Sequence, residues 1–212
     1  EGSESPTQCP PGTNSTSTGL QAVEDCPPCA AGFHCPLAGT EIASSKCPDG
    51  YFCPSGTANP SSLGLTLSCP TGSHCPLGSK APIDCAAGTY QDERGKPDCK
   101  QCLEGYYCQL ETTTPADCPQ GSYCPAGTRF GNEFLCPVST YGDKAKLKAE
   151  SECTDCTPGM YCETAGLTAP TGKCRAGHYC TSGSDVVAPS DAASRNDICP
   201  AGHYCPEGSV SP

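Results

Sequence analysis

Apolar residues are sparse along the chain. Leu, Ile, Val and Phe together supply 23 of the 212 residues, and no apolar run approaches the roughly 18 residues of a membrane span. We therefore expect little secondary structure, with strand-like pieces of two to four residues, as around Tyr51–Phe52 and Tyr106–Tyr107. Segment 143–152 has the best helical propensity and allows a single turn. Segments 55–68 and 181–198 are rich in Ser, Thr and Pro, and we predict that they are loops.

One seven-residue unit, Cys-x-x-Gly-x-aromatic-Cys, occurs eight times, with His allowed in the ring position. The mid-unit glycine permits a positive φ, so the chain can reverse between the two cysteines. The ring beside the second cysteine supplies most of the local apolar burial. The copies begin and end at Cys29 and Cys35, Cys47 and Cys53, Cys69 and Cys75, Cys102 and Cys108, Cys118 and Cys124, Cys156 and Cys162, Cys174 and Cys180, and Cys199 and Cys205.

The other six cysteines form three wider pairs, each followed after two residues by a short unit. These pairs are Cys9 with Cys26, Cys85 with Cys99, and Cys136 with Cys153. A wide pair and the two short units after it make a module of six cysteines, and two short units are left over. The predicted divisions are module 1 with a linker at 1–68, a two-cysteine unit at 69–84, module 2 at 85–135, module 3 at 136–198, and a further two-cysteine unit at 199–212.

The composition is that of a disulfide scaffold, with 22 Cys, 24 Gly and 23 Pro. So few large apolar residues exclude a single large hydrophobic core, and with it most enzyme folds of this length. The predicted fold class is small disulfide-rich modules in tandem, mostly loops and short β-hairpins, forming an elongated rod with little helix. Disulfides require an oxidising compartment, so we expect an extracellular protein, and a mature or excised piece of a longer secreted or surface chain.

The disulfide pairing stays open, because six cysteines alone allow fifteen pairings. In two schemes the wide pairs bond to themselves. Every short unit also closes on itself in the first scheme, whereas adjacent short units interlock in the second, as 29–47 with 35–53. A third scheme links each unit to the next, as 35–47 and 53–69.

The formal net charge of −11 argues against nucleic acid and against anionic membrane as partners. Lys144, Lys146 and Lys148 form the densest basic cluster, which we interpret as a solvated loop face. The partners that we expect instead are other copies of the chain, neighbouring extracellular repeat modules, and glycans.

The run from Cys85 to Cys102, with Gly105-Tyr-Tyr-Cys and Gly121-Ser-Tyr-Cys-Pro-Ala-Gly-Thr, resembles the ephrin-receptor-like cysteine-rich repeat. The resemblance covers nearly the whole chain, and the layout is also similar to tumour-necrosis-factor receptor modules. It implies tandem disulfide-linked modules in ectodomains, adhesins and extracellular fibres, with no catalytic residues. Ser139 departs from the pattern, because glycine is expected at that position.

Three Cys-x-x-Cys motifs and four histidines suggest a zinc site. However, His34 and His74 occupy the ring position, and His178 and His203 precede the ring, so we interpret all four as substitutions within a structural repeat. No nucleophile elbow is present, and the acidic residues lack EF-hand spacing. We therefore expect neither an enzyme nor a cofactor.

Asn14-Ser15-Thr16 is an N-glycosylation sequon, which predicts a glycan on Asn14. The function indicated by the repeats is that of a rigid extracellular spacer, or a building block of a surface fibre such as a mastigoneme-like filament. The alternative is a receptor-like or adhesin module that binds a protein ligand. Phe130 and Phe134 are the candidate contacts for such a ligand, since no repeat position explains them; packing between modules is their other interpretation.

Overall fold

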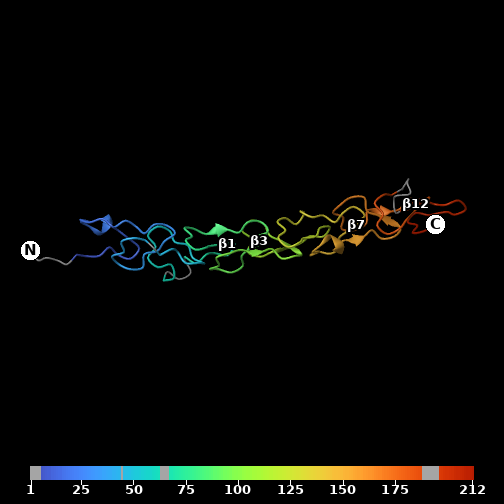
Figure 1. The fold of residues 1–212 in the computed structure, drawn as a ribbon. Helices are drawn as coiled ribbons and strands as arrows, with labels where there is room; N and C mark the ends of the chain where they lie inside the picture. The colour runs from blue at the N-terminus through green and yellow to red at the C-terminus, as the bar shows by residue number, and fades with distance from the viewer. Residues whose placement is uncertain (1–5, 44, 63–66, 188–195) are drawn as a thin grey trace, which may run out of the picture. The chain divides into compact units, whose positions relative to one another are not determined.

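The computed structural model describes residues 6–43, 45–62, 67–187 and 196–212. The chain divides into two compact units. The first comprises Glu1–Lys100 with Leu110–Thr114, and the second comprises Gln101–Gln109 with Pro115–Pro212. The ribbon consists mostly of loops, with a few short strand arrows (Figure 1). Loops dominate both units, which confirms the predicted fold class of small disulfide-rich modules with short hairpins and little helix.

Regular structure in the described part of the chain consists of two- and three-residue pieces. The 3₁₀ turns are η1 (Val23–Asp25) and η3 (Glu150–Glu152). The strands of the first unit are β1 (Ser73–His74), β2 (Ile83–Asp84) and β3 (Thr89–Tyr90), and β4 (Lys100–Gln101) lies at its boundary. Those of the second are β5 (Tyr106–Tyr107), β6 (Ala116–Asp117), β7 (Thr140–Tyr141), β8 (Thr154–Asp155), β9 (Met160–Tyr161), β10 (Gly172–Lys173), β11 (His178–Cys180) and β12 (Asn196–Ile198).

The expected strand at Tyr106–Tyr107 is β5, and the helical turn expected in 143–152 is η3 at the end of that segment. Tyr51 forms only an isolated bridge with Ser68. The loop prediction for 181–198 is wrong for its last three residues, which pair with β11 as β12. Parts of both predicted loops, 63–66 and 188–195, lie outside the described residues.

Each repeat is a short hairpin that begins at a cysteine. The chain turns at the glycine three residues later, runs for two residues, and returns just before the cysteine of the next repeat. In the sixth repeat β5 pairs antiparallel with β6, so that Tyr106 faces Asp117 and Tyr107 faces Ala116. The repeats begin at Cys9, Cys29, Cys47, Cys69, Cys85, Cys102, Cys118, Cys136, Cys156, Cys174 and Cys199, and are numbered 1 to 11 below.

Every repeat closes one disulfide within itself, and all 22 cysteines are bonded. This is the pairing in which both the wide pairs and the short units close on themselves. The bonds are 9–26, 29–35, 47–53, 69–75, 85–99, 102–108, 118–124, 136–153, 156–162, 174–180 and 199–205. The cross-links stabilise the folded chain in place of an apolar core. A disulfide that closes a loop of about 15 residues stabilises the folded state by around 3 kcal/mol.

The buried apolar side chains are almost all cysteines. Leu147, at 8% exposed, is the other large apolar side chain among them, whereas Leu37 and Ile42 stand 71% and 68% exposed. Burial of this kind is possible without leucines and isoleucines because each repeat only has to cover one disulfide. Many of the larger apolar side chains therefore lie on the surface.

Candidate functional site: the contacts between repeats

Within each compact unit, the first glycine of a repeat joins that repeat to the next through two backbone hydrogen bonds. In repeat 2 the Gly32 amide donates to the Cys53 carbonyl at 2.8 Å, and the Gly32 carbonyl accepts from the Cys47 amide at 2.9 Å. Because both groups are main-chain, this pair of bonds is independent of the side chains around it. The same pair recurs between repeats 9 and 10, where Gly159 bonds Cys180 and Cys174.

Two further backbone bonds complete the contact. The Cys35 amide donates to the Thr57 carbonyl at 3.0 Å, and the Gly56 amide donates to the Cys29 carbonyl at 2.8 Å. Repeats 2 and 3 are therefore joined by four hydrogen bonds that involve cysteines and glycines of the repeat motif. An equivalent set of four links repeats 6 and 7 within the second compact unit.

The first glycine also lies against a carbonyl group two repeats further along. A Cβ added at Gly159 would stand 2.5 Å from the Gly208 carbonyl oxygen, and one added at Gly105 would stand 2.9 Å from that of Lys146. Real Cβ atoms do not approach oxygen so closely, so alanine at these places requires the backbone to shift. Within the second compact unit, repeats 6 and 9 are thus each bonded to the next repeat and packed against the one beyond it.

Among the described residues, three other than glycine adopt the left-handed conformation, and all three stand where other repeats have glycine. They are Glu111, Ser139 and Lys146, with φ of 59°, 76° and 67°. Their amides still make the bonds of the missing glycines: that of Ser139 donates to the Cys162 carbonyl at 3.1 Å, and that of Lys146 to the Cys118 carbonyl at 2.8 Å. The departure at Ser139 therefore leaves the contact between repeats 8 and 9 in place.

Lysine side chains add to the contact between repeats 6 and 8. Lys146 Nζ lies 3.1 Å from Asp117 Oδ1 and 4.8 Å from the centroid of the Tyr106 ring, and Lys148 Nζ lies 2.8 Å from Glu104 Oε1. The Lys146 and Lys148 side chains stay 47% and 51% exposed, which agrees with a solvated face, and each also pairs with an acidic residue far away in the sequence. The hydrogen bond to the Tyr106 hydroxyl, and after it the one to Asp117, raises the pKa of Lys146. The hydrogen bond to Glu104 raises the pKa of Lys148.

Gln91 occupies the place of a cysteine in repeat 5. Its amide donates to the Thr112 carbonyl and its carbonyl accepts from the Gly72 amide, which are the bonds that the second cysteine makes in a short repeat. The side chain is 1% exposed, and its Nε2 donates to the Asp98 carbonyl at 2.6 Å. The buried Gln91 side chain thus occupies the place that a cysteine has in the short repeats. Cys85 is bonded instead to Cys99, which comes eight residues after Gln91.

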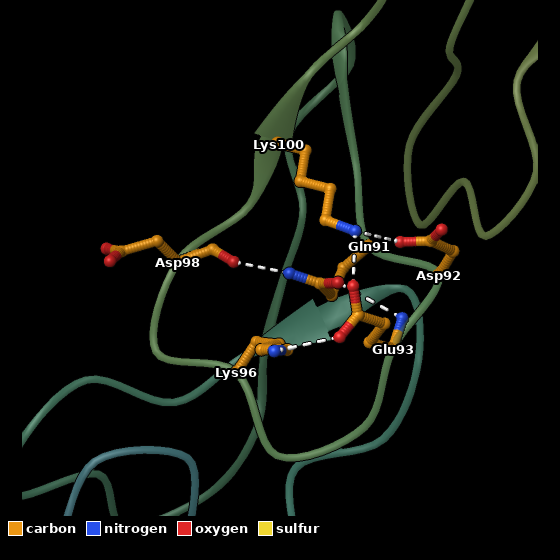
Figure 2. A network of polar contacts seen from close by, with 6 residues as sticks. All are labelled: Gln91, Asp92, Glu93, Lys96, Asp98 and Lys100. Carbon is orange, nitrogen blue, oxygen red and sulfur yellow. Dashed lines mark hydrogen bonds and ion pairs between the residues drawn. The ribbon is translucent and has the colours of Figure 1, made fainter.

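The loop between Gln91 and Cys99 carries a network of charges on its outer side (Figure 2). Lys100 Nζ lies 2.6 Å from both Asp92 Oδ1 and Glu93 Oε1, and Lys96 Nζ lies 2.8 Å from Glu93 Oε2. Hydrogen bonds from Lys100 and then Lys96 lower the pKa of Glu93 to about 2, and the bond from Lys100 lowers the pKa of Asp92. The network closes the widened loop and leaves the carboxylates paired with lysines.

Phe130 and Phe134 flank a loop that one ion pair clamps. Arg129 Nη2 lies 2.6 Å from Glu133 Oε1, and Glu133 Oε2 accepts the Arg129 amide at 2.8 Å. The Phe134 ring packs on Tyr123, with 5.7 Å between centroids, so local packing explains part of its environment. The side chains nevertheless stay 48% exposed at Phe130 and 37% exposed at Phe134.

The four histidines lie in four different repeats. His74 Nδ1 is 2.9 Å from the Pro97 carbonyl, whereas Nδ1 of His34 and of His178 is buried without a hydrogen-bond partner. No group of three or more His, Cys, Asp or Glu side chains within the described ranges is placed to hold a metal ion. No helix in that part of the chain is both long and apolar enough to cross a bilayer.

Comparison with known proteins assigns no family: no protein-family model matches the chain, and no curated protein is significantly similar to it. The function is therefore inferred from the geometry of the repeats. Eleven local disulfides in 212 residues characterise a stable module of the extracellular type.

Proposed function

We propose that this chain is a structural segment of an extracellular protein, either a rigid spacer or a building block of a surface fibre such as a mastigoneme-like or glycan-coated filament. The observation that carries the proposal is the contact between repeats, in which the same four backbone hydrogen bonds recur from one disulfide-closed repeat to the next. A contact made of main-chain atoms tolerates sequence change in the loops, as structural arrays require.

The proposed mechanism is resistance to extension. A pulling force meets first the hydrogen bonds between repeats and then the disulfide of each repeat, which limits how far its loop can open. In the short repeats the bonded cysteines are six residues apart, so a released short repeat adds little length. We expect the partners to be other copies of the chain, neighbouring extracellular repeat modules and glycans, and we expect no enzymatic activity.

The resemblance of Cys85–Cys102 to ephrin-receptor-like repeats supports the proposal, because that family occurs in ectodomains and extracellular fibres. Membership of the family is part of the proposal. Its cheapest test is whether the wide repeats of further extracellular chains also close their wide cysteine pair on itself, as 85–99 does here.

The test of the structural role is electron microscopy of the oxidised chain in negative stain, together with small-angle scattering. Regular fibres are the result expected of a building block, and isolated particles with a radius of gyration clearly above the roughly 17 Å of a globule of this length are expected of a spacer. Particles no larger than such a globule would overturn both forms of the proposal.

A receptor-like or adhesin module is the second candidate, favoured by the exposed Phe130 in its clamped loop. Aromatic side chains held by a rigid loop are frequent anchors of protein interfaces. The discriminating variant is Phe130→Ala, with Phe33→Ala in the repeat motif as the matched control. Loss of cell-surface binding in the first variant alone, with the disulfides intact, would favour the receptor; equal binding in both would remove this candidate.

A further inference from the structure

Asn14 occupies the ring position of repeat 1. The assignment rests on backbone bonds: the Gly12 amide donates to the Cys35 carbonyl at 2.8 Å, and the Ser15 amide donates to the Thr40 carbonyl at 3.0 Å. These are the bonds that the first glycine and the second cysteine make in the short repeats. Asn14, which directly precedes Ser15, therefore stands where the short repeats carry His, Phe or Tyr. The sequence motif did not reveal this, because the wide repeat 1 has no cysteine at Ser15.

The side chain at this position reaches the next repeat. Asn14 Nδ2 donates to the Glu41 carbonyl oxygen at 3.3 Å. In repeat 4 the ring-position residue makes the corresponding contact, since His74 Nδ1 lies 2.9 Å from the Pro97 carbonyl. The amide at the second-cysteine position donates to the Thr40 carbonyl in repeat 1 and to the Lys96 carbonyl in repeat 4. Glu41 and Pro97 directly follow these two acceptors, so the two side-chain contacts are equivalent.

We propose that Asn14 is a glycosylation site whose first sugar stands in the place of the missing ring. The side chain is half-exposed within the sequon Asn14-Ser15-Thr16, and its amide nitrogen carries two hydrogens. One of them donates to Glu41, and the other is available for substitution. A glycan on Nδ2 therefore keeps the bond to repeat 2, and that bond orients the sugar along the surface that the rings occupy elsewhere.

The transfer needs a lipid-linked oligosaccharide diphosphate as the donor. A bond forms between Nδ2 of Asn14 and the anomeric carbon of the sugar, and the bond between that carbon and the phosphate oxygen breaks. The lipid diphosphate leaves with the bonding electron pair, and one proton of Nδ2 passes to a base. Nothing is oxidised or reduced. The inference requires a secreted chain, and it holds whether or not the chain forms fibres.

The physical consequence lies in repeat 1 itself. Where this position holds a ring, the ring packs on a residue of its own repeat, as Tyr161 lies against Gly172 and as Tyr123 packs on Phe134. The Asn14 side chain is shorter than these rings. The first sugar would place an apolar face beside the Ser15–Thr40 bond, so the Ser15 amide should exchange more slowly when Asn14 is modified.

The test compares secreted protein from a eukaryotic host with three variants. Thr16→Ala removes the acceptor motif and leaves Asn14 in place, Asn14→Gln removes the acceptor itself, and Asn14→Tyr restores a ring. Mass spectrometry of the peptide around Asn14, before and after an amidase that releases N-glycans, is expected to find the glycan in the parent chain and in none of the variants. An unmodified Asn14 in secreted, fully oxidised protein would overturn the site.

The position of the sugar is tested by hydrogen exchange at the Ser15 amide. We expect exchange about fivefold slower in the glycosylated chain than in Thr16→Ala, because one ring-sized contact changes local opening by that order. The Asn14→Tyr variant should match the glycosylated chain. A glycan that leaves Ser15 exchange equal to that of Thr16→Ala would overturn the ring-position role, and the Gly32 amide in repeat 2 serves as an internal reference.

Discussion

The first glycine of a repeat is constrained both by its positive φ and by a carbonyl group two repeats away. The two constraints can be separated, because Gly159 and Gly177 share the conformation but not the contact. Their φ values are 78° and 88°; a Cβ on Gly159 would meet the Gly208 carbonyl, and one on Gly177 would meet no atom within 4 Å. These neighbouring repeats of the second compact unit therefore form a matched pair.

We expect Gly177→Ala to lower the free energy of unfolding by about 1 to 2 kcal/mol, because alanine is strained in the left-handed conformation. Gly159→Ala should cost roughly 1 to 3 kcal/mol more, because the backbone must also move away from the new methyl group. Native-state hydrogen exchange of the Cys174 and Cys199 amides, which bond to Gly159 and Gly177 respectively, measures both losses. Equal losses at the two places would contradict the packing between repeats 9 and 11.

The second residue-scale prediction concerns pH. The pKa of Glu93 is lowered from 4.5 to about 2 by Lys100 and Lys96, so the folded state binds its proton more weakly than the unfolded state does. The stabilisation of the loop is therefore complete above about pH 4.5 and is lost as the pH falls towards 2. The carboxyl carbon of Glu93, followed by NMR, should titrate near pH 2 in the oxidised chain.

The control for this titration is Lys100→Met, which keeps most of the side-chain length and removes the charge. The Glu93 pKa should then move back towards 4.5 while Lys96 still holds it somewhat below that value. A Glu93 carboxyl that titrates at the same pH in both proteins would show that the network in Figure 2 does not form in solution.

At the scale of the element, the wide and the short disulfides differ in exposure. Cys26, Cys99 and Cys153, the second cysteines of the wide pairs, are half-exposed, whereas both cysteines of a short repeat such as Cys47 and Cys53 are 0% exposed. The difference follows from the insertion: a second cysteine that comes later in the repeat lies outside the inter-repeat contact. Reductant should therefore reach the wide bonds more easily, through Cys26, Cys99 and Cys153, and in the first pair through Cys9 as well.

We predict that mild reduction opens the wide disulfides first. The oxidised chain would be treated briefly with a phosphine reductant, alkylated, and mapped by mass spectrometry. Alkylation should appear at 9, 26, 85, 99, 136 and 153 before it appears at Cys47 or Cys53. Simultaneous labelling of wide and internal short pairs would contradict the role of exposure. The pair Cys199–Cys205 is a separate case, because Cys199 is half-exposed as well.

For the whole molecule, contacts between near neighbours predict that damage stays local. A Cβ at Gly105 would lie 2.9 Å from the Lys146 carbonyl oxygen, so Gly105→Val disturbs repeats 6 to 8. Hydrogen exchange read by mass spectrometry should accelerate in those repeats and stay unchanged in repeats 2 and 10. A uniform acceleration along the chain would mean that the repeats unfold together, which would argue against a modular array.

The cysteine spacing alone predicted the tandem repeat and the fold class, because the information involved is local. A unit with five residues between its cysteines has few ways to fold, and the glycine between them marks the turn. The lack of leucine, isoleucine, valine and phenylalanine likewise excluded a large core. The same sequence left the pairing of the short units open, because self-closed and interlocked disulfides fit the spacing equally well.

The tertiary structure decided which residues are equivalent across repeats and which repeats touch. Gln91 stands at a cysteine position of the motif and Asn14 at a ring position, although neither residue type indicates this. Only the backbone hydrogen bonds show the equivalence. The partners of Lys146 and Lys148 lie 29 and 44 residues away, a distance in sequence that no periodic pattern specifies. Local spacing thus determined where each repeat begins and turns. The closure of the short units and the contacts between repeats depend on how the loops stack, which is a property of the folded chain.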